Sequence, residues 1–185
     1  MSRGRKTSER YLYNQPVRVS TRLRERVPSQ AMADVPFVPP SFEPPAGLVR
    51  DAFVLEPLDP RHNELDYSAW SRSIGHIRST PGFPDGGWPR QMTLQENRGD
   101  LERHARDFVA RRGFTYTVLD ADDGDVIGCV YIYPLAGEPG AEVSSWIRAD
   151  RAALDVPLAE AVATWLEEAW PFERVSYAGR PGLSR

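Results

Sequence analysis

The stretch FTYTVLDADDGDVIGCVYIYP, residues 114–134, decides the fold of this chain. Its first seven residues are rich in β-branched and aromatic side chains, which is typical of a strand. Asp123-Gly124 then favours a hairpin turn, because glycine readily adopts the positive φ that such a turn requires. Residues 126–133 are apolar on both faces of the strand they would form, which indicates a buried central strand. The sequence therefore predicts an antiparallel hairpin at the centre of a sheet.

Two amphipathic helices are predicted upstream of this hairpin. The first begins at Asp59-Pro60, an N-cap followed by proline in the first turn, and its apolar residues have helical spacing at Trp70, Ile74 and Ile77. The second begins at Thr93, which has the spacing of a capping box with Glu96, and it ends at Gly113.

The remaining elements complete an α+β domain. Strands are predicted around residues 53–57, 141–148 and 174–178, and a third amphipathic helix carries Leu158, Ala161, Val162, Trp165 and Leu166. The predicted order is β-α-α-β-β-β-α-β. We expect helices packed on a mixed, mostly antiparallel sheet.

Charge is distributed unevenly along the 185 residues. The formal net charge is −3, yet residues 1–31 hold eight basic and two acidic side chains, so the rest of the chain has a net charge of −9. An acidic body argues against a globular surface that binds nucleic acid. The basic segment is either an inert extension or a contact for a polyanion.

Composition excludes further classes of protein and site. A single cysteine, Cys129, permits neither an internal disulfide nor a multi-cysteine zinc site. The longest apolar stretch, ten residues from 126 to 135, is too short to span a membrane, and the basic start is not followed by the apolar core of a signal peptide. We therefore expect a soluble cytoplasmic protein without a metal or a membrane contact.

Prolines separate an N-terminal extension from the domain. Five of them lie between residues 36 and 45, where their missing N–H groups oppose both helix and sheet. We expect residues 1–49 to form a basic, then proline-rich extension with little stable structure, with Phe37 and Phe42 as its candidate contacts to the domain. Residues 50–180 are expected to form the single domain and residues 181–185 a short tail. Met32 is an alternative start of translation.

From about Phe53 to Ala178 the chain resembles the GNAT superfamily of N-acetyltransferases. The order of elements is similar, and AEVSSWIRADRAALDVPLAEAVATWL, residues 141–166, resembles the family's fourth strand, cofactor loop and following helix. Residues 127–130, Ile-Gly-Cys-Val, are similar to its third strand. The resemblance implies a GNAT-like fold that transfers an acetyl group from acetyl-coenzyme A (acetyl-CoA) to an amine of a small molecule or a peptide.

The resemblance also implies where acetyl-CoA binds. Strand backbone at Ser145, Trp146 and Ile147 would pair with the pantetheine arm, and the turn would face the diphosphate through Arg148, Arg151, Ala152 and Ala153. This turn departs from the family pattern, because it has no glycine and because Asp155 adds a negative charge. The chain also ends soon after the fifth strand. A GNAT-like binding or regulatory module without catalysis is therefore an alternative, and a homodimer is an assembly that the sequence leaves open.

Acetyl transfer to an amine needs a proton acceptor for the ammonium and a proton donor for the leaving sulfur. Glu142 is the candidate base, and Tyr131 and Tyr133, on one face of the central strand, are the candidate acids. The alternatives are a solvated charge at a strand end for Glu142 and core aromatic residues for the tyrosines. Cys129 lies on the same face, and we expect it to be structural, because direct transfer needs no thiol nucleophile.

The loop STPGFPDGGWPRQ, residues 79–91, joins the two upstream helices. The resemblance implies that this loop lines the acceptor site, with Phe83 and Trp88 as contacts and Asp85 as a partner for a cationic amine. A purely structural lid over the sheet is the alternative. The histidines lack a second metal ligand at helical spacing, so we expect no metal site.

Overall fold

The structure is a computed structural model that describes residues 36–83 and 87–185. The basic segment 1–31, the alternative start Met32 and the candidate acceptor contact Asp85 lie outside the described residues.

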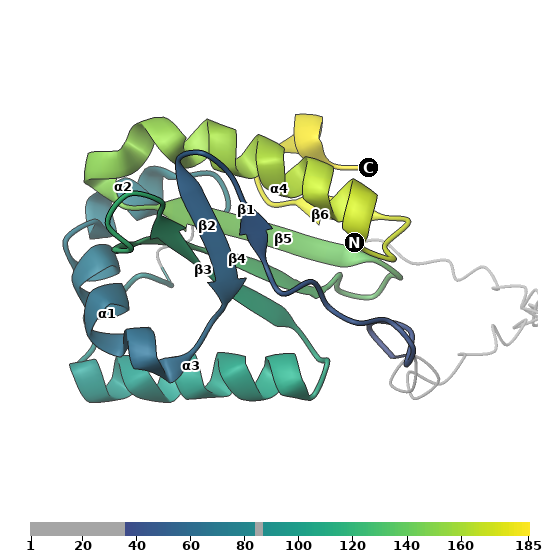
Figure 1. Cartoon of the computed structure of the whole chain (residues 1–185), viewed down its shortest axis with the longest axis horizontal. Helices are drawn as coiled ribbons and strands as arrows, with labels where there is room; N and C mark the ends of the chain where they lie inside the picture. Colours follow the sequence, from purple (N-terminus) through teal and green to yellow (C-terminus); the bar gives the residue numbers. More distant parts are fainter. Residues whose placement is uncertain (1–35, 84–86) are drawn as a thin grey trace, which may run out of the picture. The chain divides into compact units, whose positions relative to one another are not determined.

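A six-stranded sheet runs through the domain in the order β1-β2-β3-β4-β5-β6 (Figure 1). Neighbours from β1 to β5 are antiparallel, and β5 and β6 are parallel. The predicted α+β fold with a mixed, mostly antiparallel sheet is therefore confirmed. The strands are β1 (Leu48–Val49), β2 (Phe53–Pro57), β3 (Phe114–Asp120), β4 (Val126–Pro134), β5 (Ala141–Ile147) and β6 (Val175–Tyr177).

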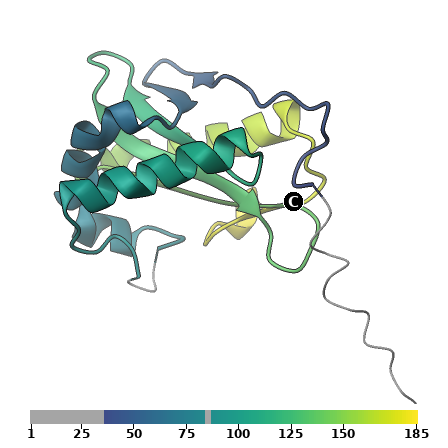
Figure 2. The same cartoon turned by 90° about the horizontal axis from the view of Figure 1, so that it is seen from below.

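Helices cover both faces of this sheet (Figures 1 and 2). One apolar cluster joins α1, α2 and α3 to β4 and β5, and a second joins α4 to the opposite face. Helix α3 begins with the predicted capping box, in which Thr93 Oγ1 accepts from the Glu96 N–H at 3.1 Å and the Glu96 carboxylate accepts from the Thr93 N–H at 2.7 Å. The helices are α1 (Asn63–Ser71), α2 (Ile74–Ser79), α3 (Leu94–Val109) and α4 (Asp155–Ala169).

The first predicted helix is divided in the structure. A 3-10 turn at Pro60–His62, capped by Asp59, leads into α1, and α1 and α2 are separated at Arg72 and Ser73. Ser73 is buried, and its hydroxyl accepts a hydrogen bond from the Ala149 N–H at 3.0 Å. The break brings this hydroxyl to the turn that follows β5, a contact that helical periodicity could not reveal.

The proline-rich segment 36–49 packs against the domain. Val38 is buried, and the ring of Phe37 stacks on the rings of Phe114 and Phe172. The Arg111 guanidinium also donates to the carbonyl oxygens of Pro39 and Phe42. Phe37 and Phe42 thus contact the domain, and the segment is ordered against it by apolar contacts, by side-chain hydrogen bonds and, at Leu48–Val49, by pairing with β2. This part of the extension therefore has more stable structure than expected.

Residues 181–185 fold back onto β6. The backbone N–H groups of Val175 and Arg185 each donate to the other residue's carbonyl oxygen at 2.9 Å. The Arg185 guanidinium also donates to the carbonyl oxygens of Leu166 and Phe172, both at 2.9 Å. The short tail thus ties β6 to the end of α4.

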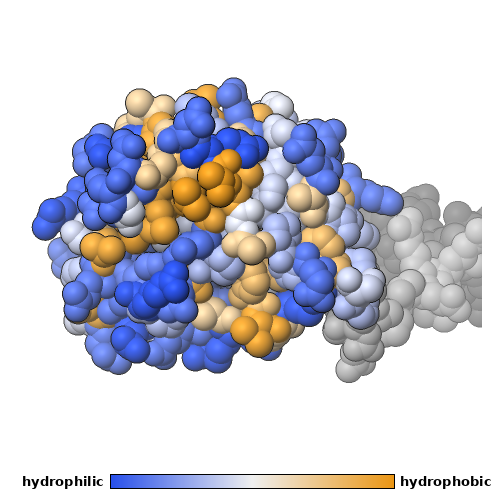
Figure 3. Space-filling view, viewed as in Figure 1, coloured by the Kyte–Doolittle hydropathy of each residue, from blue (hydrophilic) through white to orange (hydrophobic). Residues whose placement is uncertain are grey.

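The surface carries scattered apolar residues. The face in Figure 3 is mostly hydrophilic and interrupted by separate apolar patches. The exposed large apolar residues of the described chain are Val49, Leu65, Leu94, Val109 and Val156. Within the described residues, none of the helices has both the length and the apolar character needed to cross a bilayer.

Gly128 provides a test of the packing between the central strands. It pairs with Ile147, and a methyl group at its Cα would overlap the carbonyl oxygen of Trp146. We expect Gly128→Ala to lower the free energy of unfolding by about 1–3 kcal/mol or more, because the strands must move apart. Gly99→Ala is the matched control: a methyl group there, on α3, has no neighbour within 4 Å, and it should stabilise the helix by about 0.5–1 kcal/mol. Urea denaturation measures both changes, and equal stability of the two variants would contradict this account.

Candidate active site

A cavity of about 400 Å³ lies on the side of the sheet covered by α1, α2 and α3. Two carboxylates and four aromatic rings dominate its lining, and they come from α1, the loop before α3, α3 itself and β4. These residues are Asp66, Asp100, Phe83, Trp88, Tyr131 and Tyr133.

Asp66 is the buried carboxylate of this cavity. It lies in the first turn of α1, and only 7% of its surface is exposed. Asn97 of α3 donates from Nδ2 to Asp66 Oδ2 at 2.9 Å and accepts from the Trp70 indole N–H at Oδ1, also at 2.9 Å. Burial raises the pKa of Asp66 to about 6, since loss of water penalises the charged form more than the Asn97 hydrogen bond favours it.

Tyr131 places a phenol in the cavity from β4. Its hydroxyl oxygen accepts a hydrogen bond from the Trp146 indole N–H at 3.2 Å, and the hydroxyl also interacts with the Cys129 side chain on the same face of β4. Burial raises the pKa of Tyr131 well above its usual value, so the phenol keeps its proton at neutral pH. Burial also raises the pKa of Cys129, which keeps the thiol neutral.

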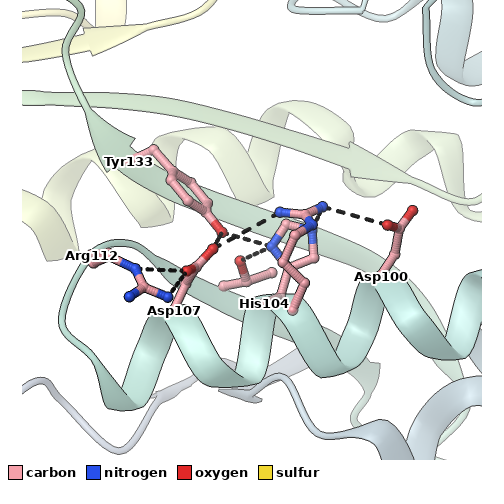
Figure 4. A network of polar contacts seen from close by, with 7 residues as sticks. Asp100, His104, Asp107, Arg112 and Tyr133 are labelled. Atoms are coloured by element: carbon pink, nitrogen blue, oxygen red, sulfur yellow. Dashed lines mark hydrogen bonds and ion pairs between the residues drawn. The ribbon is translucent and has the colours of Figure 1, made fainter.

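Tyr133 ends in a polar network with His104 and Asp107 (Figure 4). His104 Nδ1 lies 2.7 Å from the Tyr133 hydroxyl and 3.1 Å from Thr115 Oγ1, and the Tyr133 hydroxyl donates to Asp107 Oδ2 at 3.3 Å. The Arg103 guanidinium donates to His104 Nε2 at 3.1 Å, so Nε2 is an acceptor and Nδ1 carries the hydrogen. Burial lowers the pKa of His104 to about 4, and the imidazole is therefore neutral at physiological pH.

The pairing between β5 and β6 ends partway along β5. The last registered pair is Val143 with Tyr177, and the Val143 carbonyl oxygen accepts from the Ala178 N–H at 2.8 Å. Because strand backbone groups alternate in direction, the N–H and C=O groups of Ser145 and Ile147 point to this same side, beyond the end of β6. Beyond Val143 this edge of β5 is therefore not paired with β6, although Ser145 and Ile147 are both buried. The unpaired edge lies next to Ser144, which lines the cavity.

The turn after β5 is held by ion pairs. Arg148 Nε donates to Asp150 Oδ1 at 2.6 Å, and Arg151 Nε donates to Asp120 Oδ2 at 2.9 Å. The hydrogen bonds from these arginines lower the pKa of Asp150 and of Asp120. Both arginines of the predicted diphosphate turn are thus already bound to carboxylates, and the Ala149 amide is bound to a serine hydroxyl.

Helix α4 begins at a further ion pair. Arg180, just after β6, donates to Asp155 Oδ2 at 2.5 Å, and both side chains are largely buried. The Arg180 guanidinium also lies over the Tyr177 ring, 5.9 Å from its centroid. An arginine from the end of the sheet therefore pairs with the first residue of α4. A glycine-containing turn at this position would leave backbone amides open to phosphate.

The predicted site residues fall into three groups, and Glu142 lies apart from them. Phe83, Trp88, Tyr131 and Tyr133 meet in the cavity, and Ser145 and Ile147 lie on β5 with their backbone groups toward the edge that β6 leaves unpaired. Trp146 lies between them, and its backbone groups point the other way, toward β4. Arg148, Arg151, Ala152 and Ala153 lie in the turn before α4. Glu142 is exposed at the start of β5 and does not line the cavity. No group of three potential metal-binding side chains occurs among the described residues.

Sequence reasoning missed Asp66, Asn97 and His104. Asp66 precedes Trp70 by four residues and therefore shares its helix face, and Asn97 and His104 flank Leu101 at helical spacing. The signal that could have identified them is a polar residue within the apolar stripe of a helix. Such a residue is buried together with its neighbours and needs a polar partner.

Comparison with known proteins bears on the fold. No protein-family sequence model and no curated protein sequence matches the chain. A solved structure of the ribosomal-protein-S5-alanine acetyltransferase from Vibrio fischeri matches with a TM-score of 0.57 at 13% identity, covering 72% of this chain and 73% of that one. The apo structure of RimL, a ribosomal L7/L12 alpha-N-protein acetyltransferase, matches with a TM-score of 0.56 at 11% identity, covering 70% and 68%.

A third match is the microcin C7 self immunity acetyltransferase MccE, solved in complex with acetyl-CoA and AMP. Its TM-score is 0.52 at 13% identity, and the match covers 72% of this chain and 73% of that one. At these identities the likeness concerns the backbone fold. The resemblance seen in the sequence is thereby confirmed at that level, and the chain has the fold of the GNAT superfamily of acetyltransferases.

Proposed function

We propose that the protein transfers an acetyl group from acetyl-CoA to an amine of a small molecule or a peptide. The observation that carries the proposal is that the cavity meets the edge of β5 that β6 leaves unpaired, at Ser144. An acyl donor lying along that edge and an amine in the cavity would be neighbours, which is the arrangement that direct transfer requires. The GNAT-like fold supports the same reading, since MccE was solved with acetyl-CoA.

The described residues offer more suitable contacts to the pantetheine arm of acetyl-CoA than to its phosphates. Backbone groups of Ser145 and Ile147 can pair with pantetheine amides as a strand edge pairs with an added peptide. The turn offers Arg148 and Arg151 in place of glycine amides, and each would have to exchange a carboxylate for a phosphate. When bound, acetyl-CoA supplies the acetyl group as a reactive thioester.

Two side chains of the cavity can move the protons of the reaction. Ionised Asp66 can accept a proton from the acceptor ammonium, and Tyr131 Oη holds a proton that can pass to a leaving thiolate. Asp66 is favoured over Glu142 as the base because it lines the cavity. The neutral His104 and Tyr133 extend a hydrogen-bonded path from the cavity to Asp107.

A GNAT-like module without catalysis is the second candidate. The observation that favours it is the Arg180–Asp155 pair at the start of α4, together with the glycine-free turn. Such a protein would keep the cavity as a binding site and lose the donor site. Binding of acetyl-CoA separates the two candidates.

We expect acetyl-CoA to bind in a calorimetric titration and to slow amide hydrogen exchange in β5. Protection should appear in peptides that contain Ser145 and Ile147, because N–H groups that β6 leaves unpaired become hydrogen-bonded to the donor. Peptides from β3, which pairs with strands on both sides, provide the internal control. Absence of binding at millimolar acetyl-CoA would favour the module.

Replacing Tyr131 tests its role as the proton donor. In Tyr131→Phe we expect kcat to fall at least about 100-fold with little change in the KM for the amine, because general acid catalysis contributes to the transition state. Tyr67→Phe is the matched control, since Tyr67 donates to the Met92 carbonyl and does not line the cavity. Steady-state release of free thiol measures both variants, and equal kcat values would remove Tyr131 from the mechanism.

A buried carboxylate retained for proton transfer should lower stability at neutral pH. The folded-state pKa of Asp66, about 6, exceeds the ordinary value near 4, so the native carboxyl keeps its proton where the unfolded one has lost it. Stability therefore decreases as pH rises from about 4 to about 6 and then stays level. Asp66→Asn, which can still accept from Asn97, should raise the free energy of unfolding by up to about 3 kcal/mol above pH 6.

The same comparison below about pH 4 should show no gain, because both side chains are then neutral. Urea denaturation at several pH values measures the difference. Glu102→Gln, an exposed substitution on α3 with the same change in charge, should show only a small effect at every pH. A destabilised Asp66→Asn protein at high pH would show that Asp66 is a structural residue.

A further inference from the structure

The cavity contains a buried acid without a cationic partner. Among the residues the structure describes, no arginine, lysine or histidine forms an ion pair with Asp66, whose hydrogen-bonding partner is the neutral amide of Asn97. The carboxylate keeps acceptor capacity beyond the single Asn97 hydrogen bond and lies in the cavity lining. An ionised buried carboxylate is strongly stabilised by a positive charge beside it, so the position favours a cation as ligand.

The other charges of the cavity do not cancel this preference. Arg103 is the cation of the lining, but it is half exposed and lies 3.7 Å from Asp100 and 3.9 Å from Asp107. His104 is neutral. The cavity thus has one negative charge that the nearby cations do not neutralise. A ligand with one positive charge would balance it.

Aromatic rings form the walls around this charge. Trp88 lies at their centre, with ring centroids 5.6 Å from Phe83 and 6.5 Å from Tyr131. Ring faces attract organic cations, and the rings also accept the apolar part of such a ligand. A cavity of about 400 Å³ suits a small organic molecule or one side chain of a peptide.

From charge, rings and size we infer that this cavity binds organic monocations, in which a protonated amine lies at Asp66 and an aromatic or branched apolar body lies between Trp88, Phe83 and Tyr131. The inference rests on the proposed function in one respect: the proposed function identifies this cation as the acceptor of the acetyl group. Binding of the cation itself requires no acyl donor. A neutral ligand of the same shape would leave Asp66 unpaired, and an anion would meet an uncompensated carboxylate.

The test compares 2-phenylethylamine with its neutral counterpart 2-phenylethanol, in calorimetric titrations of the full chain without a donor. At about pH 8 Asp66 is ionised and the amine still carries its proton. We expect the amine to bind at least tenfold more tightly than the alcohol. Asp66→Asn should reduce this preference to less than about twofold, because it removes the charge and keeps the hydrogen bond from Asn97.

Two controls make the result specific to the cavity. Glu102→Gln removes one negative charge outside the cavity and should preserve the tenfold preference. Trp88→Leu should weaken amine binding more than alcohol binding, because a leucine keeps the apolar contact and loses the ring face. Circular dichroism checks that each variant is folded.

Equal affinities for amine and alcohol, no amine binding, or an unchanged preference in Asp66→Asn would each overturn the inference. Different results would overturn the proposed function. Amine binding without acetylated product in the presence of acetyl-CoA would contradict acetyl transfer and leave the cation site in place. Acetyl transfer that does not depend on Asp66 would contradict the cation site and leave the proposed function in place.

Discussion

The double pairing of β4 is the constraint on which the rest of the structure depends. This strand pairs with β3 on one side and β5 on the other, and its residues alternate between the two faces of the sheet. Val130 and Ile132 enter the core beneath α4, whereas Cys129 and Tyr131 face α1 and α3. A shift in register by one residue would exchange these faces and take the phenol out of the cavity. Core packing and cavity chemistry are thus set by one strand.

Asn97 has a corresponding role between the helices. Its amide contacts Trp70, Asn63 and Asp66, so one α3 residue satisfies several buried polar groups of α1. Buried polar groups are tolerated when they are hydrogen-bonded, and here the satisfied network also places a carboxylate in the cavity. The same contacts that join α1 to α3 therefore orient Asp66. Packing between these helices and the electrostatics of the cavity are coupled through a single amide.

Local patterns predicted the elements, and long-range contacts account for most of what they missed. The hairpin of β3 and β4 was predictable because β-branched residues, a glycine turn and a doubly apolar strand occur in sequence order. The break at Ser73 was missed, since the hydrogen bond that Ser73 makes there is to Ala149, far along the chain. Asp66 was missed because its role depends on contacts far along the chain, namely the hydrogen bond from Asn97 and its place in the cavity lining. The cavity tyrosines were found, because strand alternation places Tyr131 and Tyr133 on one face.

The segment 36–49 has a consequence for where the domain can be divided. Its side chains cover Phe114 and Trp170, and its backbone accepts hydrogen bonds from Arg111 and from the hydroxyl of the buried Tyr116. Trimming the chain to the residues that resemble a GNAT domain would expose an aromatic surface and remove the acceptors of these donors. The packed domain therefore includes the proline-rich segment 36–49, and its N-terminal limit is set by these contacts, which the family resemblance did not predict.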